Sequence, residues 1–569
     1  MIIEEYKKWL ANATLDSDLI AELKAIENDQ SAIDDAFYTD LSFGTAGLRG
    51  VIGAGTNRMN VYTVGKATQG LAEYVKSVSS NPSVAIAYDS RIKSDVFARA
   101  AAEILAANGV KVYIYKELMP TPMLSYAVRY FKCDSGIVIT ASHNPAKYNG
   151  YKAYSPDGSQ LGPEAADYVL SIMNKIDVFK DIKRVDFDKA VSDGIIEFIG
   201  DDVIESYLDE VEKCRVNKNL DLSKINVVYT PLNGTGNKPV RRIFERIGVK
   251  NVSIVKEQEK PDGNFPTAPY PNPEIRQAFD CAFKTAKEVS PDLIIATDPD
   301  ADRTGIAVRI GDDYRLMSGN DVGALLLEYI LKCRKALGTL PSAPFAVKTI
   351  VSTEICKKIA EDYKCELKEV LTGFKFIGEQ ITILEESGND DRFVFGFEES
   401  YGYLAGPYVR DKDAVVASML ICEMAAYYKE QGLSLIDVLE NLYKKYGYYL
   451  CMQKGFVCEG QSGMKKIADT MERIRNNPPK TIAGKAVSVF KDFEKSVSLD
   501  LATGKTEGTN LPKSNVLGFY LEDGSLLIIR PSGTEPKIKL YICAVGGDEK
   551  SAACVRDEIQ KDGEKILDF

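Results

Sequence analysis

The chain contains a single histidine among its 569 residues, His143. This count excludes zinc sites built from two or three imidazoles. A Ser-His-Asp triad is not expected either, because His143 directly follows Ser142 and neighbouring side chains of an extended segment point to opposite sides. Chemistry at Ser142 is therefore expected to depend on charge and a metal ion rather than on a histidine relay.

Several other sequence patterns are missing. No apolar run approaches the ~18 residues that span a membrane, and the N-terminal segment carries acidic residues that are unlike a signal peptide. Neither a Walker motif nor a Rossmann glycine motif is present, so nucleotide binding has no support. The net charge of −11 argues against nucleic acid or a membrane surface as a partner. No pattern predicts an oligomeric state.

The eleven cysteines are scattered along the chain and show no CxxC spacing. An odd number of cysteines without such spacing is typical of reduced residues in a protein core. We therefore expect reduced core cysteines and a cytoplasmic protein.

The length exceeds that of one hydrophobic core, so several domains are expected. From residue 84 onward strand-like and helix-like segments alternate, which favours βαβ units. The strand-like runs form three sets, within 84–139, 225–296 and 345–396, and each set ends in a polar loop. The sequence predicts an α/β fold with three similar mixed-sheet α/β domains and a smaller C-terminal α+β domain. The expected domain ranges are 1–205, 206–318, 319–447 and 448–569.

The first polar loop is Thr-Ala-Ser-His-Asn-Pro at 140–145, directly after the apolar run 136–139. A β-rich run that changes to small polar residues and proline is typical of a strand that opens into an exposed loop. Ser142 is expected at the tip of this loop, where a reacting group can reach it.

The second loop places Asp298, Asp300 and Asp302 at alternate positions, followed by Arg303. An EF-hand is excluded, because it requires a glycine where Arg303 stands and a glutamate where Arg309 stands. Three carboxylates are too few to enclose Ca²⁺ but suit Mg²⁺, which keeps open positions for a phosphate oxygen. The loop therefore predicts a magnesium site, with Arg303 placed to meet an anion beside it.

Three further segments offer groups for a phosphorylated ligand. The segment 530–537 combines an arginine, hydroxyls and a glycine, which suits a phosphate that is bound but not transferred. The glycines of 43–50 allow a tight loop that brings Arg49 toward an anion. The loop 396–402 offers carboxylates to sugar hydroxyls, although paired glutamates in loops are usually only solvated.

Taken together, these loops resemble the α-D-phosphohexomutase family, the phosphoglucomutases and phosphomannomutases. The match follows the family order through 44–50, 140–145, 298–303, 396–400 and 530–537. The segments 266–274 and 372–375 resemble the longer phosphoglucomutase branch. The resemblance spans nearly the whole chain and implies four domains around a central cleft.

The resemblance also implies roles for individual residues. Ser142 is expected to be the phosphoserine and, with Asp298, Asp300 and Asp302, to hold Mg²⁺. The residues expected to contact the sugar are Thr372, Gly373, Phe374, Glu398 and Ser400. Those expected to hold the existing phosphate are Arg530, Ser532, Gly533 and Thr534.

Catalysis in such a site is mostly placement and neutralisation of charge. Arg49, Arg303 and Lys152 are expected to supply positive charge, with Arg303 also contacting the substrate. By resemblance, Lys412 is the candidate general acid or base, and Lys152 is the other candidate. His143 is expected to orient the phosphoserine loop.

The leading hypothesis is interconversion of glucose 1-phosphate and glucose 6-phosphate, with glucose 1,6-bisphosphate as intermediate and activator. The Glu-Glu-Ser form of the sugar loop favours glucose over mannose by resemblance. Phosphopentomutase or phosphomannomutase activity by the same mechanism is the closest alternative. A phosphatase that uses the same serine is a rival from another reaction class, and a non-enzymatic sugar-phosphate sensor is the third.

Overall fold

The computed structural model describes residues 2–45, 47–458, 460–532 and 537–568. The chain divides into two compact units. The first contains residues 1–317, 378–393 and 401–429, and the second contains residues 318–377, 394–400 and 430–569. Each unit is described by itself.

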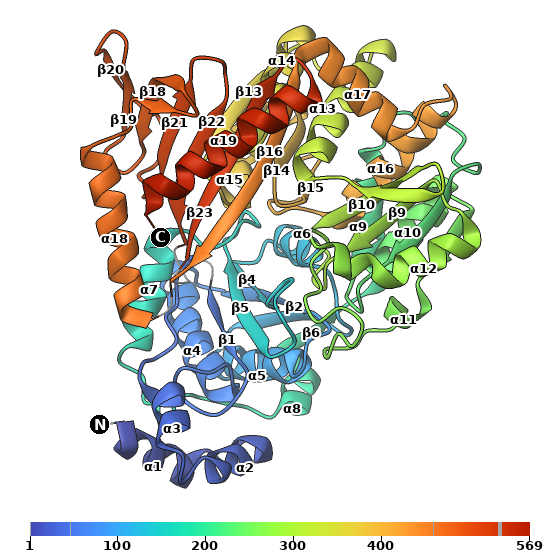
Figure 1. Cartoon of the computed structure of the whole chain (residues 1–569). Coiled ribbons are helices and arrows are strands. Elements are labelled where there is room, and N and C mark those ends of the chain that lie inside the picture. The colour runs from blue at the N-terminus through green and yellow to red at the C-terminus, as the bar shows by residue number, and fades with distance from the viewer. Residues whose placement is uncertain (1, 46, 459, 533–536, 569) are drawn as a thin grey trace. The chain divides into compact units, whose positions relative to one another are not determined.

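The first unit begins with three short helices, α1 (Ile2–Asn12), α2 (Ser17–Ala25) and α3 (Gln30–Phe37), coloured dark blue in Figure 1. Asp16 and Asp29 cap α2 and α3, because their side chains accept N–H groups of the first turn. Trp9, the only tryptophan of the chain, is fully buried and packs edge-on against aromatic rings at Phe37, Tyr62 and Phe179. This aromatic cluster joins the helices to the domain that follows them.

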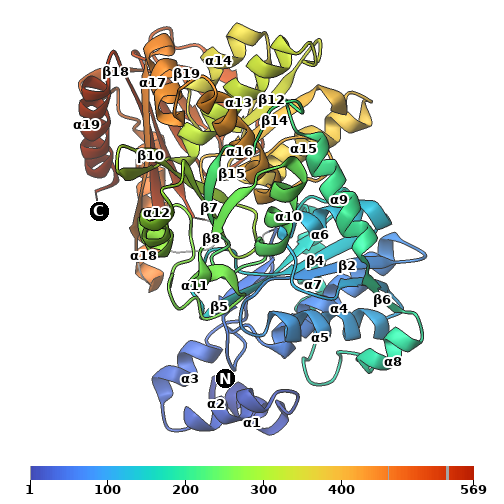
Figure 2. The same ribbon diagram turned by 90° about the vertical axis from the view of Figure 1, so that its right-hand side faces the viewer.

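The first sheet has six strands in the order β1-β5-β4-β2-β3-β6. Its strands are β1 (Leu48–Val51), β2 (Ser83–Tyr88), β3 (Lys111–Tyr115), β4 (Ser135–Ile139), β5 (Tyr148–Tyr154) and β6 (Ile196–Ile199). The four strands β4, β2, β3 and β6 are parallel, while β5 and β1 are antiparallel additions. The accompanying helices are α4 (Val61–Val78), α5 (Ser94–Ala107), α6 (Thr121–Phe131), α7 (Pro163–Met173), α8 (Phe187–Ser192) and α9 (Asp201–Lys213). Figure 2 shows α4 and α5 side by side against this sheet.

The second sheet has five strands in the order β11-β10-β9-β7-β8. They are β7 (Asn226–Thr230), β8 (Asn251–Ile254), β9 (Leu293–Thr297), β10 (Thr304–Ile310) and β11 (Asp313–Leu316). The strands β9, β7 and β8 are parallel, and β10 turns back along β9. The helices of this part of the chain are α10 (Asn237–Ile247), α11 (Lys256–Glu259), η1 (Arg276–Phe279) and α12 (Asp280–Val289). The first unit is completed by η2 (Asp390–Arg392), β15 (Gly402–Leu404) and α16 (Ala414–Lys429).

The second unit begins with α13 (Gly319–Ala336), whose buried face matches the helical spacing of apolar residues in the sequence. A parallel pair follows, β12 (Phe345–Thr349) with β13 (Glu366–Val370), and β14 (Phe393–Glu398) lies beside β12. The helices here are α14 (Ile355–Tyr363), α15 (Phe374–Glu386) and α17 (Leu435–Tyr446). Residues 374–377 of α15 and 394–398 of β14 belong to this unit.

The C-terminal part of the second unit is built on antiparallel pairs in the order β16-β23-β22-β21-β18-β19-β20, with β17 paired to β18. The elements are β16 (Tyr448–Val457), α18 (Gly460–Asn476), β17 (Thr481–Ile482), β18 (Lys485–Asp492), β19 (Val497–Asp500), β20 (Thr506–Gly508), β21 (Leu517–Leu521), β22 (Leu526–Pro531), β23 (Lys537–Gly546) and α19 (Glu549–Leu567). Helix α19 packs along β23 (Figure 1, red).

The predicted fold class is confirmed: mixed α/β sheets precede a smaller C-terminal domain with an antiparallel sheet. Each of the three predicted sets of strand-like runs contains strands: β2 to β4 in the first set, β7 to β9 in the second and β12 to β14 in the third. Among the residues that the structure describes, no helix combines the length and apolar character that crossing a membrane requires.

The cysteines differ in one respect from the expectation of reduced thiols. Cys451 on β16 and Cys543 on β23 stand directly opposite each other and form a disulfide. Directly opposed residues of antiparallel strands bring their Cβ atoms close together, and strand pairing over this separation cannot be read from cysteine spacing. Six of the remaining cysteines are buried, as expected for core residues.

Candidate active site

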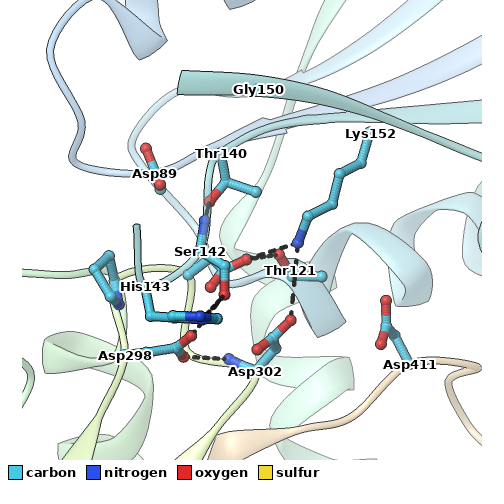
Figure 3. A network of polar contacts seen from close by, with 12 residues as sticks. Asp89, Thr121, Thr140, Ser142, His143, Gly150, Lys152, Asp298, Asp302 and Asp411 are labelled. Atoms are coloured by element: carbon cyan, nitrogen blue, oxygen red, sulfur yellow. Dashed lines mark hydrogen bonds and ion pairs between the residues drawn. The ribbon is translucent and has the colours of Figure 1, made fainter. Parts of the chain in front are cut away.

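Ser142 lies just after the carboxyl end of β4, in a loop that turns sharply. Its backbone adopts the left-handed conformation, with φ of 52°, and its N–H donates to the Thr140 hydroxyl at 2.8 Å. The Ser142 hydroxyl donates to Oδ2 of Asp298, which lies in the loop after β9, at 2.9 Å (Figure 3). The side chain is therefore buried, with only 4% of the residue exposed, and the predicted exposed position is wrong because the carboxylate loop covers it.

His143 faces the same hydroxyl, contrary to the prediction from an extended chain. Its Nδ1 lies 3.3 Å from Ser142 Oγ, because the left-handed turn at Ser142 places the two side chains on one side. Burial lowers the pKa of His143 well below 6.5, and the positive charges of Arg303 and Arg49 lower it further. The imidazole is therefore neutral near pH 7. Asp298 bonds the serine rather than the histidine, so the three residues do not form a relay.

The three aspartates of the second loop converge as the sequence predicted. Each offers one carboxylate oxygen, and these three oxygens lie within 4.8 Å of one another. Asp298 Oδ1 shapes the loop, because it accepts the N–H groups of Asp302 at 3.1 Å and Arg303 at 3.0 Å. All three carboxylates are almost completely buried.

The carboxylate triad fits a metal ion. Oδ1 of Asp300 and Oδ1 of Asp302 are buried, and neither accepts a hydrogen bond within the described part of the chain. Burial and the negative charges of Asp300 and Asp302 raise the pKa of Asp298 well above its usual value. Burial has the same effect on Asp300, but Lys152 and Lys412 outweigh it and hold its pKa low. Buried carboxylate oxygens that accept no hydrogen bond are suitable ligands for a hard divalent cation.

Both candidate lysines lie against the carboxylate triad. Lys152 on β5 places its Nζ 3.0 Å from Asp300 Oδ2. Lys412 places its Nζ 2.8 Å from Asp302 Oδ2 and 3.2 Å from Asp411 Oδ1. Each lysine is 6% exposed. Two ammonium groups thus flank the three carboxylates, an arrangement that can stabilise a phosphoryl group.

The two predicted arginines are placed differently. Arg49 on β1 is exposed and opposite Gly150 of β5, and its charge reaches His143. Gly47 allows the segment before β1 to lie close against β5, because a Cβ at this position would lie 1.8 Å from the Tyr151 carbonyl oxygen. Arg303 Nη1 bonds Glu274 Oε1 at 2.8 Å, an acidic partner that the sequence did not predict for it.

Sequence reasoning missed two residues of the site. Thr121, the first residue of α6, donates its hydroxyl to Asp300 Oδ2 at 3.0 Å and its N–H to the Asp300 carbonyl at 2.9 Å. Asp411 accepts the Tyr154 hydroxyl at 2.7 Å besides contacting Lys412. The proline on each side of Thr121 indicated the start of a helix. No local pattern linked Thr121 to the loop of Asp300, which lies far along the chain.

The residues assigned to sugar and phosphate lie in the second unit. Glu398 Oε1 accepts the Gly373 N–H at 2.7 Å, so these two sugar-loop residues are together. Phe374 is buried, while Thr372 and Ser400 are half-buried. Burial raises the pKa of Tyr541, and the charges of Glu399, Arg530 and Glu398 also act on it, so Arg530 lies near the glutamate pair.

The predicted phosphate-binding loop is described only in part. Arg530 and Pro531 are the last two residues of β22, and Ser532 follows them, where its N–H donates to the Lys537 carbonyl at 2.7 Å. Gly533 and Thr534 lie outside the described residues. Their predicted roles stay predictions.

The fold and this site define a class of protein: a multidomain α/β enzyme with a buried serine beside a carboxylate triad. Four family models match the chain in order. Their descriptions are phosphoglucomutase/phosphomannomutase α/β/α domains I, II and III, at residues 40–179, 205–311 and 318–446, and the C-terminal domain, at residues 471–561. The chain belongs to the phosphoglucomutase/phosphomannomutase family, as the ordered motifs of the sequence predicted.

Named relatives agree with this assignment. The chain is 38% identical over 537 residues to the phosphoglucomutase of Staphylococcus saprophyticus, with 94% of this chain and 95% of the relative covered. It is 38% identical over 540 residues to the phosphoglucomutase of Staphylococcus aureus strain MRSA252, with 93% and 96% covered.

Solved structures share the fold. The Paramecium phosphoprotein pp63/parafusin, a phosphoglucomutase in an open form, superposes with a TM-score of 0.71 at 18% identity, covering 93% of this chain and 96% of that one. A phosphoglucomutase/phosphomannomutase family protein of Burkholderia thailandensis superposes with a TM-score of 0.65 at 17% identity, covering 92% and 97%.

Proposed function

We propose that this protein is a phosphoglucomutase that interconverts glucose 1-phosphate and glucose 6-phosphate through a phosphoserine at Ser142. The observation that carries the proposal is the Ser142 hydroxyl 2.9 Å from Asp298, within a buried carboxylate triad flanked by two lysines. The relatives named phosphoglucomutase support the choice of substrate.

The proposed reaction has two balanced halves. A sugar hydroxyl oxygen bonds to the phosphorus on Ser142, the bond from phosphorus to Ser142 Oγ breaks, and the hydroxyl proton ends on Oγ. This step forms glucose 1,6-bisphosphate. In the second half Ser142 Oγ bonds to the phosphorus of the other phosphate of that bisphosphate, the bond from this phosphorus to the sugar oxygen breaks, and the serine proton ends on that sugar oxygen. This step regenerates phosphoserine and releases the isomer.

Mg²⁺ is the cation that suits the triad, because it needs only a few protein carboxylates and keeps coordination positions open for a phosphate oxygen. We propose that Asp298, Asp300 and Asp302 hold it, together with an oxygen of phosphorylated Ser142. When bound, it supplies positive charge that stabilises the transferring phosphoryl group.

The chain's own side chains supply the remaining charge and the proton transfer. The ion pairs of Lys152 with Asp300 and of Lys412 with Asp302 support the proposal that both lysines hold phosphoryl oxygens and that one of them moves the proton between the sugar hydroxyl and Ser142. We assign the proton transfer to Lys412, and Lys152 is the alternative. His143 is neutral and accepts or donates at Oγ, which suits orientation of the serine. Arg49 adds positive charge at the edge of the site.

The second unit is proposed to bind the substrate. Glu398, Ser400 and residues 372–374 are assigned to sugar hydroxyls, and Arg530 with the loop that follows it to the phosphate that is not transferred. The loop starts at the carboxyl end of β22, which pairs with β21 and β23. Arg303 is retained as a substrate contact that must exchange its partner Glu274 for an anion. We also propose a cytoplasmic location, on the composition alone.

The test is phosphate on Ser142. Purified protein exposed to glucose 1,6-bisphosphate should gain one phosphate at this residue by intact-mass and peptide analysis, and should then convert glucose 1-phosphate to glucose 6-phosphate. The Ser142→Ala variant should do neither, while Ser171→Ala, a change at an exposed helix position, should behave as wild type. Turnover that persists in Ser142→Ala contradicts the proposal.

The same assay separates the alternatives. A higher kcat/KM for ribose 1-phosphate or mannose 1-phosphate than for glucose 1-phosphate would assign a pentose or mannose substrate. Release of inorganic phosphate without isomer formation would indicate a phosphatase instead. A sensor would bind sugar phosphate without either reaction.

A further inference from the structure

The Ser142 loop is wrapped around a buried guanidinium group. Arg91, between β2 and α5, has no exposed side-chain surface. Its Nη2 donates to the carbonyl oxygens of Ser142, at 2.5 Å, and Asn144, and its Nη1 donates to those of Pro145 and Tyr148, each at 3.0 Å. One side chain therefore binds four carbonyl groups of the segment that carries Ser142.

Arg91 is itself held in place. Its Nε lies 3.3 Å from Asp89 Oδ2, and Asp89 Oδ1 accepts both the Arg91 N–H at 2.9 Å and the Ser94 hydroxyl at 2.7 Å. The Arg91 Cζ lies over the Phe265 ring, 5.1 Å from the ring centroid. A buried arginine with an ion pair, an aromatic face and four carbonyl acceptors has one orientation available to it.

The other backbone group of Ser142 is also bound by a side chain. Its N–H donates to Thr140 Oγ1 at 2.8 Å, while its carbonyl accepts from Arg91. Figure 3 shows Thr140 above Ser142, with Asp89 to the left of Thr140. Both polar backbone groups of a residue in the left-handed region are thus fixed by side chains rather than by regular secondary structure.

We propose that Asp89, Arg91 and Thr140, which we term the Ser142 clamp, position Ser142 for phosphoryl transfer; this inference rests on the proposed function. The clamp acts in two ways. It keeps the left-handed turn that points Oγ at Asp298 Oδ2, and the Arg91 guanidinium group neutralises four carbonyl oxygens of the loop that would otherwise repel a phosphoryl group. Arg91 is fully buried, so it is a positioning residue and not a catalytic one.

The test compares Arg91→Lys with Arg184→Lys. Arg184 is also a largely buried arginine of the first unit that donates to a backbone carbonyl, that of Val61, so it is a matched control. An ammonium group cannot reach four carbonyls in a planar fork. We expect Arg91→Lys to lower kcat per phosphorylated molecule about 100-fold, as a small misplacement of a reacting group does. KM for glucose 1-phosphate should stay near the wild-type value, and Arg184→Lys should retain wild-type kcat.

A second variant covers the case in which Arg91→Lys does not fold. Thr140→Val keeps the shape of a buried side chain and removes the hydroxyl that accepts the Ser142 N–H and also interacts with Asp89, another member of the clamp. It should lower kcat per phosphorylated molecule about 10-fold with KM unchanged. Phosphate on Ser142 is counted by mass in every sample, so a loss of folded protein is not mistaken for a loss of catalysis.

The outcomes distinguish this inference from the proposed function. If wild type gains no phosphate at Ser142 and no turnover, the proposed function fails and the clamp with it. If wild type is phosphorylated and active but Thr140→Val and folded Arg91→Lys have wild-type kcat per phosphorylated molecule, only the clamp is overturned. Activity lost strictly in proportion to folded protein would show a structural role and would also overturn it.

Discussion

Replacing Asp298 with asparagine should make the metal-free protein more stable and should weaken its stabilisation by Mg²⁺. The change removes one of three buried carboxylate charges and keeps the shape of the side chain. An asparagine Oδ1 can still accept the N–H groups of Asp302 and Arg303, and its amide can hydrogen-bond with the Ser142 hydroxyl. The local structure of the loop is therefore expected to survive.

The size of the effect follows from the separation of the charges. Two unit charges no more than 4.8 Å apart repel by at least about 3 kcal/mol at an effective dielectric constant near 20. Asp298 takes part in two such pairs, but Lys152 and Lys412 offset part of the charge of its two neighbours. The raised pKa of Asp298 agrees in direction with a net penalty for its charge. A gain of about 1–3 kcal/mol in the free energy of unfolding is expected without metal.

Urea unfolding with chelator and then with Mg²⁺ measures both quantities. A ligand at a hundredfold excess over its dissociation constant stabilises a protein by about 2.7 kcal/mol, and wild type should approach this value with Mg²⁺. Asp298→Asn should gain much less. Asp292→Asn, the same substitution at a partly exposed carboxylate paired with Lys429, should respond to Mg²⁺ as wild type does.

The reasoning is refuted by one combination of results. If Asp298→Asn is less stable than wild type in chelator and gains as much from Mg²⁺, then Asp298 neither carries an electrostatic penalty nor binds the cation. The three carboxylates would then be a structural feature of the loop alone.

Three further changes test other parts of the structure. Lys412→Met should lower kcat by about 100-fold or more if this lysine moves the proton, and a larger loss in Lys152→Met would reassign that role. Arg530→Ala should mainly raise KM, because a group that binds a phosphate before and during reaction contributes to binding alone; a loss confined to kcat contradicts its assignment. Burial opposes the charge of Glu369, yet Lys348 at 2.8 Å and a second lysine hold its pKa at about 2. A lowered pKa stabilises the fold above about pH 4.5 by about 3 kcal/mol, and this is lost as the pH falls toward 2. The free energy of unfolding of Glu369→Gln, measured in urea, should therefore lie below that of wild type at neutral pH and approach it in acid. If the two unfolding free energies change with pH in parallel, the proposed contribution of the ion pair is excluded.

The carboxylate loop shows what local sequence can establish. Three aspartates at alternate positions of one loop are close together along the chain, so their spacing was enough to predict that their carboxylates converge. The same applies to the strands, whose apolar runs and polar ends are local features. The order of motifs also identified the family before any fold was known.

Ser142 shows where local sequence was insufficient. An extended segment would have exposed its hydroxyl and turned His143 away, but the residue is left-handed, buried and shared between Asp298 and His143. That conformation depends on Arg91, about fifty residues earlier, which no motif of the loop contains.

The inventory of chemical groups was thus readable from the chain, because hydrogen-bonding capacity, charge and short-range spacing belong to residue types. Their burial, protonation and direction were decided by packing. Lys412 lies on the Asp302 carboxylate and Thr121 on Asp300 only because segments more than a hundred residues apart fold against the same loop, and electrostatic effects act over distances in space rather than along the sequence.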